Sequence, residues 1–184
     1  MTTEPAWVRD VLTFWFDELE TMQWFKKDDD VDTAIEQRFK GVHQQVSEAG
    51  LDTLSTAPRT ALAAVIVLDQ FSRNMFRGTA KSFDSDPKAL ELAERILANG
   101  LDRDFNADEK AFCYLPFEHS EALANQKRSV ELFQALGNEN YANYAQAHLD
   151  IIEKFGRFPH RNAILGRTST SEENEYLAQP GSGF

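Results

Sequence analysis

Two short segments of the sequence hold arginines but no acidic residue, although the whole chain carries 30 Asp and Glu against 19 Lys and Arg. One segment runs from residue 154 to 167 and the other from residue 70 to 83. Arginine presents a planar pair of N–H donors that matches a carboxylate or a phosphate group. The two segments therefore predict a binding site for an anionic group. Their arginines are Arg73, Arg77, Arg157, Arg161 and Arg167.

A third segment combines carboxylates with an imidazole, because Glu118, His119 and Glu121 fall within four positions. Such groups suit general acid–base chemistry. The spacing matches neither the His-x-x-x-His nor the Glu-x-x-His pattern of helical metal sites. Adjacent side chains on a helix also point about 100° apart, which keeps Glu118 and His119 from sharing one ion. We therefore expect no metal and no other cofactor. The candidates for proton transfer are Glu118, His119, His148 and His160.

Three interpretations of these residues stay open. In the first, an arginine-rich groove binds an anionic small molecule or a peptide carboxylate. In the second, the protein is a small hydrolase of phosphate or carboxylate esters, whose arginines stabilise developing negative charge. In the third, the arginines form a structural lattice of ion pairs with Asp69, Glu118 and Glu121 and bind no ligand. The sequence shows no nucleophile motif and no phosphate loop, which favours binding. The predicted ligand-binding residues are Asp69, Gln70, Arg73, Asn74, Arg77, Glu118, His119, His148, Arg157, His160, Arg161, Asn162 and Arg167.

The arginine segment at residues 70–83 contains the end of a predicted helix over residues 56–76. Residues 61–68 are apolar on all sides, which is typical of a helix at the centre of a fold. At 100° per residue, the polar residues that follow lie within one arc of about 140° around the helix axis. Two turns earlier, Leu62 and Ile66 occupy the same arc. These polar residues are Asp69, Gln70, Arg73, Asn74 and Arg77. A buried face that becomes polar indicates a pocket or groove at the helix end. We expect this end and the loop 156–167 to be neighbours, forming one site.

The other segments are helical in period, and none alternates like a strand. Residues 5–19, 31–49, 86–99, 129–136 and 141–155 predict helices, and a further helix starts at Asn106 and is kinked or ended by Pro116. Gly50 is a predicted left-handed helix terminator, Asp86 a predicted cap, and Thr170 opens a short closing helix. The sequence thus predicts an all-α single domain, residues 1–184, of stacked antiparallel hairpins in a tetratricopeptide-like right-handed superhelix. The tail after residue 178 is predicted to be mobile.

Composition narrows the classes of partner. A net charge of −11 argues against a nucleic-acid partner, which requires a broad basic surface. The longest apolar run is residues 61–68, too short to span a bilayer, so no membrane partner is expected. Cys113 is the single cysteine, which suits a reducing compartment, and its apolar surroundings indicate a core residue. We expect a cytoplasmic protein with an anionic small molecule or peptide as partner.

Three motifs carry a family resemblance: LDQFSRNMFRG at residues 68–78, LPFEHSE at 115–121 and FGRFPHRN at 155–162. Together they resemble the bacterial domain-of-unknown-function family 924, over residues 14 to about 177. The resemblance implies a tetratricopeptide-like all-helical fold and a bacterial protein, and it implies no activity. One departure is Leu54, where many relatives have Trp.

Overall fold

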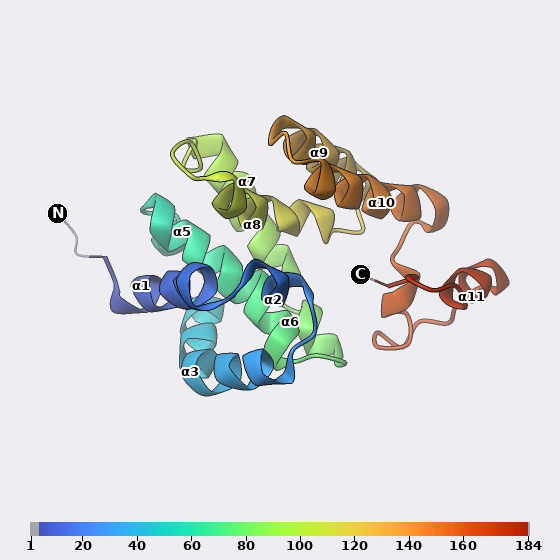
Figure 1. The fold of residues 1–184 in the computed structure, drawn as a ribbon, viewed down its shortest axis with the longest axis horizontal. Helices are drawn as coiled ribbons and strands as arrows, with labels where there is room; N and C mark the ends of the chain where they lie inside the picture. The colour runs from blue at the N-terminus through green and yellow to red at the C-terminus, as the bar shows by residue number, and fades with distance from the viewer. Residues whose placement is uncertain (1–3, 184) are drawn as a thin grey trace. The chain divides into compact units, whose positions relative to one another are not determined.

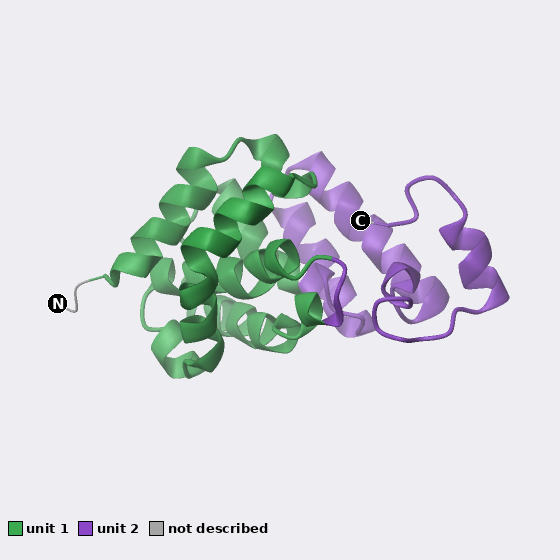
Figure 2. Ribbon diagram, turned by 90° about the horizontal axis from the view of Figure 1, so that it is seen from below, with its two compact units in different colours: residues 1–77, 81–116 green, residues 78–80, 117–184 purple. Residues whose placement is uncertain are grey.

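The computed structural model describes residues 4–183, and within this range it contains helices and no strand (Figure 1). The predicted all-α class is confirmed. The chain divides into two compact units, coloured separately in Figure 2: unit 1 holds residues up to 77 and residues 81–116, and unit 2 holds residues 78–80 and 117 onwards. The main boundary falls directly after Pro116. The single domain and the tetratricopeptide-like superhelix stay predictions.

Unit 1 contains the N-terminal helices and most of α8. Its elements are α1 (Ala6–Leu12), the π-helical η1 (Thr13–Glu18), α2 (Thr21–Phe25), α3 (Asp29–Glu48), α4 (Leu51–Leu54), α5 (Pro58–Val65), the π-helical η2 (Ile66–Phe71), α6 (Ser72–Met75), the 3₁₀ turn η3 (Ala80–Phe83, whose first residue clusters with unit 2), α7 (Asp86–Asn99) and α8 (Ala107–Glu118, up to Pro116).

The predicted central helix is α5 continued by η2 and α6, and its residues 61–68 are fully buried as expected. Its middle turns are π-helical, with a wider hydrogen-bonding step than an α-helix. The assumed rotation of 100° per residue therefore fails over residues 66–71. The first predicted helix, residues 5–19, also becomes π-helical partway along, because α1 passes directly into η1. The periodicity of apolar residues therefore predicts that these two helices exist, but it does not predict on which side of the helix the polar residues lie.

Aromatic rings fill the core of unit 1 and connect the two π-helical segments. Phe71 of η2 lies with its ring centroid 5.7 Å from Trp15 of η1 and 5.0 Å from Phe39 of α3. Trp15 in turn packs edge-on against Phe112 of α8 at 5.4 Å. The polar motif that begins at Asp69 is therefore anchored on a rigid aromatic centre.

Two predicted helix ends differ in the structure. Gly50 has φ −71°, so it is not a left-handed terminator but the residue that precedes α4. The carbonyls at the end of α3 are instead satisfied by Lys88 Nζ, which donates to Val46 O at 3.0 Å, to Ser47 O at 2.7 Å and to Ala49 O. Asp86 is the first residue of α7 and not its N-cap, which is Ser85, and its carboxylate accepts from an arginine described below.

Unit 2 holds the end of α8, α9 (Leu123–Ala135), α10 (Glu139–Phe155), the 3₁₀ turn η4 (Pro159–Arg161) and α11 (Ser171–Leu177). The short connection after α9 makes α9 and α10 a hairpin, as predicted, and α9 starts six residues earlier than expected. Gly156 ends α10 with φ 69°, a left-handed conformation that glycine adopts without strain. The chain then folds back so that Phe158 packs with Ile151 and Ile152 in a small core.

Other expectations concern the end of α8 and the C-terminal part of unit 2. Pro116 lies inside α8, which continues for two residues to Glu118 before it ends. Thr170 and Glu173 form the predicted capping box of α11. In the tail, the Ser182 hydroxyl donates to Leu177 O at 3.1 Å, while Phe184 lies outside the described residues. The mobility of the tail stays a prediction. In the described part of the chain, no helix is long and apolar enough to cross a membrane.

Candidate functional site

The polar end of the central helix in unit 1 is a buried ion-pair network. Arg73 Nη1 donates to Asp86 Oδ1 at 2.9 Å, and Nη2 donates to Asp86 Oδ2 at 3.0 Å. Nη1 also donates to the Asp69 carbonyl at 2.8 Å and lies 3.2 Å from the Asp69 carboxylate, which is 1% exposed. Gln70 Nε2 donates to that same carboxylate at 2.6 Å. The guanidinium of Arg73 is thus surrounded by acceptors of its own unit.

Asn74 and Arg77 both turn toward Asp32, in the first turn of α3. Arg77 makes a pair of parallel hydrogen bonds to Asp32, Nε to Oδ2 at 2.7 Å and Nη2 to Oδ1 at 2.8 Å. Asn74 Nδ2 donates to Asp32 Oδ1 at 2.7 Å. These contacts tie the central helix to α3. Because Arg77 is 39% exposed, its ion pair contributes less to stability than a buried one.

In unit 2, Arg157 pairs with a glutamate from the closing helix. Its Nε donates to Glu173 Oε1 at 2.7 Å and its Nη2 donates to Glu173 Oε2 at 2.8 Å. The hydrogen bonds from Arg157, assisted by the N–H of Thr170, lower the pKa of Glu173 to about 2 against the effect of burial. Glu173 therefore serves at once as a capping residue and as an ion-pair partner, and only the first role was predicted.

Arg167, the last arginine of the loop, pairs with Glu121. Nη1 donates to Glu121 Oε2 at 2.7 Å and Nη2 to Oε1 at 2.9 Å. Burial opposes the ionisation of Glu121, but hydrogen bonds from Arg167 and from the Phe158 N–H outweigh it and lower its pKa. Asn162 joins the two pairs, because its Oδ1 accepts from Arg167 Nε at 2.9 Å and its Nδ2 donates to Glu173 Oε2 at 3.3 Å.

The remaining predicted residues of unit 2 gather in what we call the imidazole cluster: Glu118, His119, His148, His160 and Arg161, with Phe158 among them. His148 and His160 each lie 5.6 Å, centroid to centroid, from the Phe158 ring, and the Arg161 guanidinium carbon lies 4.5 Å from the centre of that ring. His119 is 6.5 Å from His148 between ring centroids. Glu118 Oε1 is 3.4 Å from His148 Nδ1. The structure thus brings together residues from three separate stretches of sequence.

His148 has a defined tautomer. Its Nδ1 lies 2.8 Å from the carbonyl oxygen of Tyr144, which can only accept, so Nδ1 carries the proton and Nε2 carries the lone pair. Burial, together with the charges of His119, Arg161 and His160, lowers the pKa of His148 to about 3 against the effect of the Tyr144 hydrogen bond. Burial and then the charge of Arg161 lower the pKa of His160 to about 4. Both imidazoles are therefore neutral at neutral pH.

These pKa values limit the chemistry of the cluster. A general base works best when its pKa lies near the working pH, whereas His148 and His160 titrate several units below neutrality. Neutral imidazoles are nevertheless good hydrogen-bonding partners for a ligand. Cys113, in unit 1, is buried as predicted, and burial raises the pKa of its thiol well above the ordinary value. It is therefore unsuited to act as a nucleophile.

The structure also contains polar groups that sequence reasoning missed. Asp32, Asp86 and Glu173 accept from three of the predicted arginines, and they come from helix starts, where acidic residues are expected for capping alone. Within residues 4–183, no group of three or more His, Cys, Asp or Glu is arranged to hold a metal ion. Arg73 and Arg161 belong to different units, so their predicted proximity stays a prediction.

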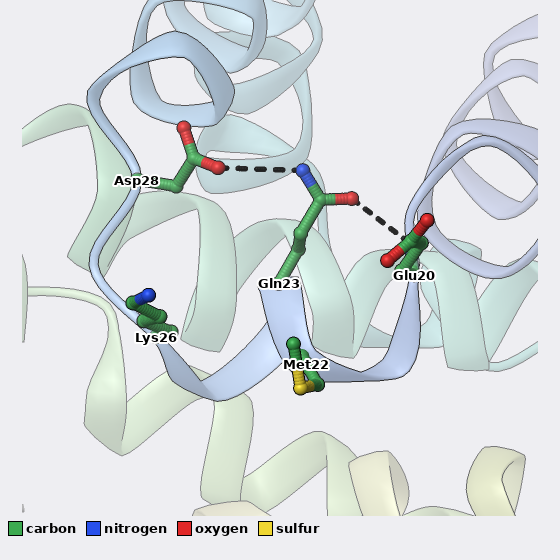
Figure 3. A pocket seen from close by; sticks show the side chains of 5 residues that line it. All are labelled: Glu20, Met22, Gln23, Lys26 and Asp28. Atoms are coloured by element: carbon green, nitrogen blue, oxygen red, sulfur yellow. Dashed lines mark hydrogen bonds between the residues drawn. The ribbon is translucent and has the colours of Figure 1, made fainter.

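A pocket of about 290 Å³ lies in unit 1 beside α2 (Figure 3). Gln23 spans it, because its Nε2 donates to Asp28 Oδ2 at 3.3 Å and its Oε1 accepts from the Glu20 N–H at 2.9 Å (Figure 3). Asp28 also caps α3 and Glu20 caps α2. Three polar residues around this pocket, Glu20, Gln23 and Asp28, thus take part in helix caps, and none of the lining residues was a predicted site residue.

Comparison with known proteins places the chain in a family. A family model described as "Bacterial protein of unknown function (DUF924)" matches residues 11–181. A solved structure of a protein of unknown function from Agrobacterium tumefaciens is similar, with a TM-score of 0.89 and 40% sequence identity over 94% of this chain and 97% of the other. Among curated proteins, none is significantly similar. With a match that spans nearly its whole length and contains all three arginine and histidine motifs, the chain belongs to the DUF924 family.

Proposed function

We propose that the imidazole cluster binds an anionic small molecule or the carboxylate of a peptide, with Arg161 as the cationic contact. The observation that carries the proposal is the gathering of the Arg161 guanidinium and the imidazoles of His148 and His160 around the Phe158 ring. Burial is the main reason that the pKa of both imidazoles is lowered, and the positive charge of Arg161 lowers it as well. A positive potential felt by two nearby groups is also felt by a ligand, and it favours an anion. The side chain of Arg161 is 93% buried, where water screens its charge weakly.

The neighbours of Arg161 add directed hydrogen bonds to this charge. The Nε2 lone pair of His148 can accept from a ligand hydroxyl or from a protonated phosphate oxygen. His119 and His160 are partly exposed, so their rings give the cluster an edge toward solvent. A carboxylate or phosphate group that carries a hydroxyl fits this combination of one cation and several imidazoles.

The other four arginines have a different proposed role. Arg73, Arg77, Arg157 and Arg167 each donate a pair of hydrogen bonds to a carboxylate, so we assign them to a structural ion-pair lattice. The proposed binding set is therefore narrower than the one predicted from sequence. The hydrolase interpretation is less well supported, because His148 and His160 are too weakly basic at neutral pH to act as general bases.

The experiment that tests the proposal is thermal unfolding with increasing phosphate, acetate or citrate at constant ionic strength. A ligand that binds only the folded state raises the melting temperature by mass action. We expect at least one of these anions to stabilise the wild type and to leave Arg161→Gln unaffected. Arg77→Gln is the matched control and should respond like the wild type. An equal response of all three proteins, or none, would overturn the proposal.

A hydrolase remains distinguishable by direct assay. Incubation with a panel of phosphate and carboxylate esters should yield no turnover above the rate of Arg161→Gln. Turnover that is lost in His148→Gln would instead establish catalysis and would require the anionic substrate to raise the pKa of His148.

A further inference from the structure

The turn that carries Glu118 and His119 is held by one side chain of α9. The last carbonyls of a helix have no partner within the helix, and at the end of α8 they point toward Gln126. Gln126 Nε2 donates to Glu118 O and to Ser120 O, both at 2.6 Å, and lies 3.5 Å from Phe117 O. Pro116 in this last turn also lacks an N–H, which removes one hydrogen bond from within the helix.

The orientation of the Gln126 amide is fixed by chemistry. All three neighbouring groups are carbonyl oxygens, which only accept, so the amide nitrogen must face them. The oxygen therefore points the other way. Gln126 is 0% exposed, and its Oε1 has no hydrogen-bond partner among the described residues. A buried acceptor without a partner lowers the stability of the folded protein. The hydrogen bonds of Gln126 Nε2 to the carbonyls at the end of α8 therefore come with an energetic penalty at Oε1.

We propose that Gln126 is a positioning residue for the imidazole cluster, an inference that rests on the proposed anion-binding function. By clamping the backbone at Glu118 and Ser120, it sets where the side chains of Glu118 and His119 begin. Those side chains then meet His148, with Glu118 Oε1 at 3.4 Å from Nδ1 and the His119 ring at 6.5 Å. Gln126 acts through the backbone and needs no contact with the ligand.

The alternative is a cap that matters only for folding. The turn has further local contacts, since the Ser120 hydroxyl accepts from Asn125 Nδ2 at 2.9 Å and from the Ala122 N–H at 3.2 Å. These contacts can hold the turn without Gln126. A purely structural cap then predicts lower stability with an unchanged site in the folded protein, whereas a positioning residue predicts an altered site.

The test uses the full chain and two variants of α9. Gln126→Met keeps the length of the side chain and removes both donors. Val130→Ala is the control, because Val130 is a buried apolar residue of the same helix and has no side-chain donor to offer the turn at Glu118. For each folded protein, phosphate and citrate affinities are measured by calorimetry, and the imidazole resonances of His119 and His148 are recorded by NMR.

We expect Gln126→Met to bind the anion about tenfold more weakly, the size of effect typical of residues that orient a ligand-binding group. The His119 and His148 resonances should shift, while Val130→Ala should keep wild-type affinity and resonances. Wild-type affinity and unshifted resonances in Gln126→Met would overturn the positioning role and leave anion binding intact. If the wild type binds neither anion, the proposed function fails, and the resonances alone then decide whether Gln126 positions the cluster. Should Gln126→Met fail to fold, Gln126→Asn, which withdraws the donors by one methylene group, provides the same comparison.

Discussion

The arginine segment of unit 1 and the arginine loop of unit 2 look alike in sequence and differ in what surrounds the guanidinium groups. Arg73 lies between Asp69 and Asp86, two carboxylates that accept its donors. Arg161 lies against Phe158 in a cluster with three imidazoles and Glu118, and its charge adds to the effect of burial in lowering the pKa of His148 and His160. A concentration of arginine in an acidic chain therefore has two physical meanings, and the neighbours decide which one applies.

The comparison also shows how the two kinds of site are positioned. Arg73 lies in α6, which directly continues the π-helical segment η2 that packs on the aromatic core of unit 1, and its acceptors come from helical residues. Arg161 belongs to a 3₁₀ turn after the Gly156 helix end. Ion pairs hold that loop on both sides, through Arg157 to Glu173 and through Arg167 to Glu121. The lattice of unit 2 thus supports the loop that presents Arg161.

The largest expected difference between the two regions is in stability. Arg73→Ala leaves the buried Asp69 and the partly exposed Asp86 without their guanidinium partner, and breaking a buried ion pair costs about 3–5 kcal/mol. Arg161→Ala removes a charge that also disfavours protonation of His148 and His160, and we expect a smaller loss than for Arg73→Ala. Urea unfolding of both variants measures the two values. Equal losses would abolish the distinction between lattice and site.

The second difference is in pH dependence. The folded-state pKa of His148 is about 3 and its ordinary value is 6.5, so the unfolded chain binds the extra proton first as the pH falls. Its stabilising contribution is complete above pH 6.5 and declines from there toward pH 3, by about 1.4 kcal/mol per pH unit. Urea unfolding across this range should show a shallower decline in His148→Leu than in the wild type. A parallel decline in both proteins would mean that His148 is not buried in its neutral form.

A smaller effect is expected for the exposed part of the lattice. Arg77 and Asp32 make two short hydrogen bonds, but the arginine is 39% exposed and its charge is screened by water. Arg77→Ala should cost no more than about 1 kcal/mol, since exposed ion pairs contribute little. The cost should fall further at high salt, whereas that of Arg73→Ala should change little. A salt-independent loss would place Arg77 in the buried class.

Much of the fold could be predicted from sequence because caps and periodicity are local. The helices beginning at Pro58 and Glu139, the capping box at Thr170 and the glycine end at Gly156 all follow from neighbouring residues. The failures have a common cause. The replacement of a Gly50 terminator by Lys88 depends on a residue distant in sequence, and neither this contact nor the π-helical hydrogen-bonding step is contained in a local pattern of residue types.

The sequence was sufficient to predict most of the residues that form the candidate site, but not which of them contact one another. All members of the imidazole cluster except Phe158 were among the predicted residues. Sequence could not assign partners to the arginines, because Glu173 lies 16 residues from Arg157 and Glu121 lies 46 residues from Arg167. It also could not reveal Gln126, whose role depends on three backbone carbonyls.

The central claim is that an anion binds at the imidazole cluster, and the four histidines of the chain allow the most direct test. His119, His148 and His160 belong to the cluster, whereas His43 belongs to unit 1 and pairs with the Ser72 hydroxyl at 2.8 Å. NMR follows all four imidazoles while phosphate or citrate replaces chloride at constant ionic strength and pH. The account predicts that the three cluster resonances shift saturably with one common dissociation constant and that His43 does not move. Cluster resonances that stay fixed, or that move no more than His43, would contradict it.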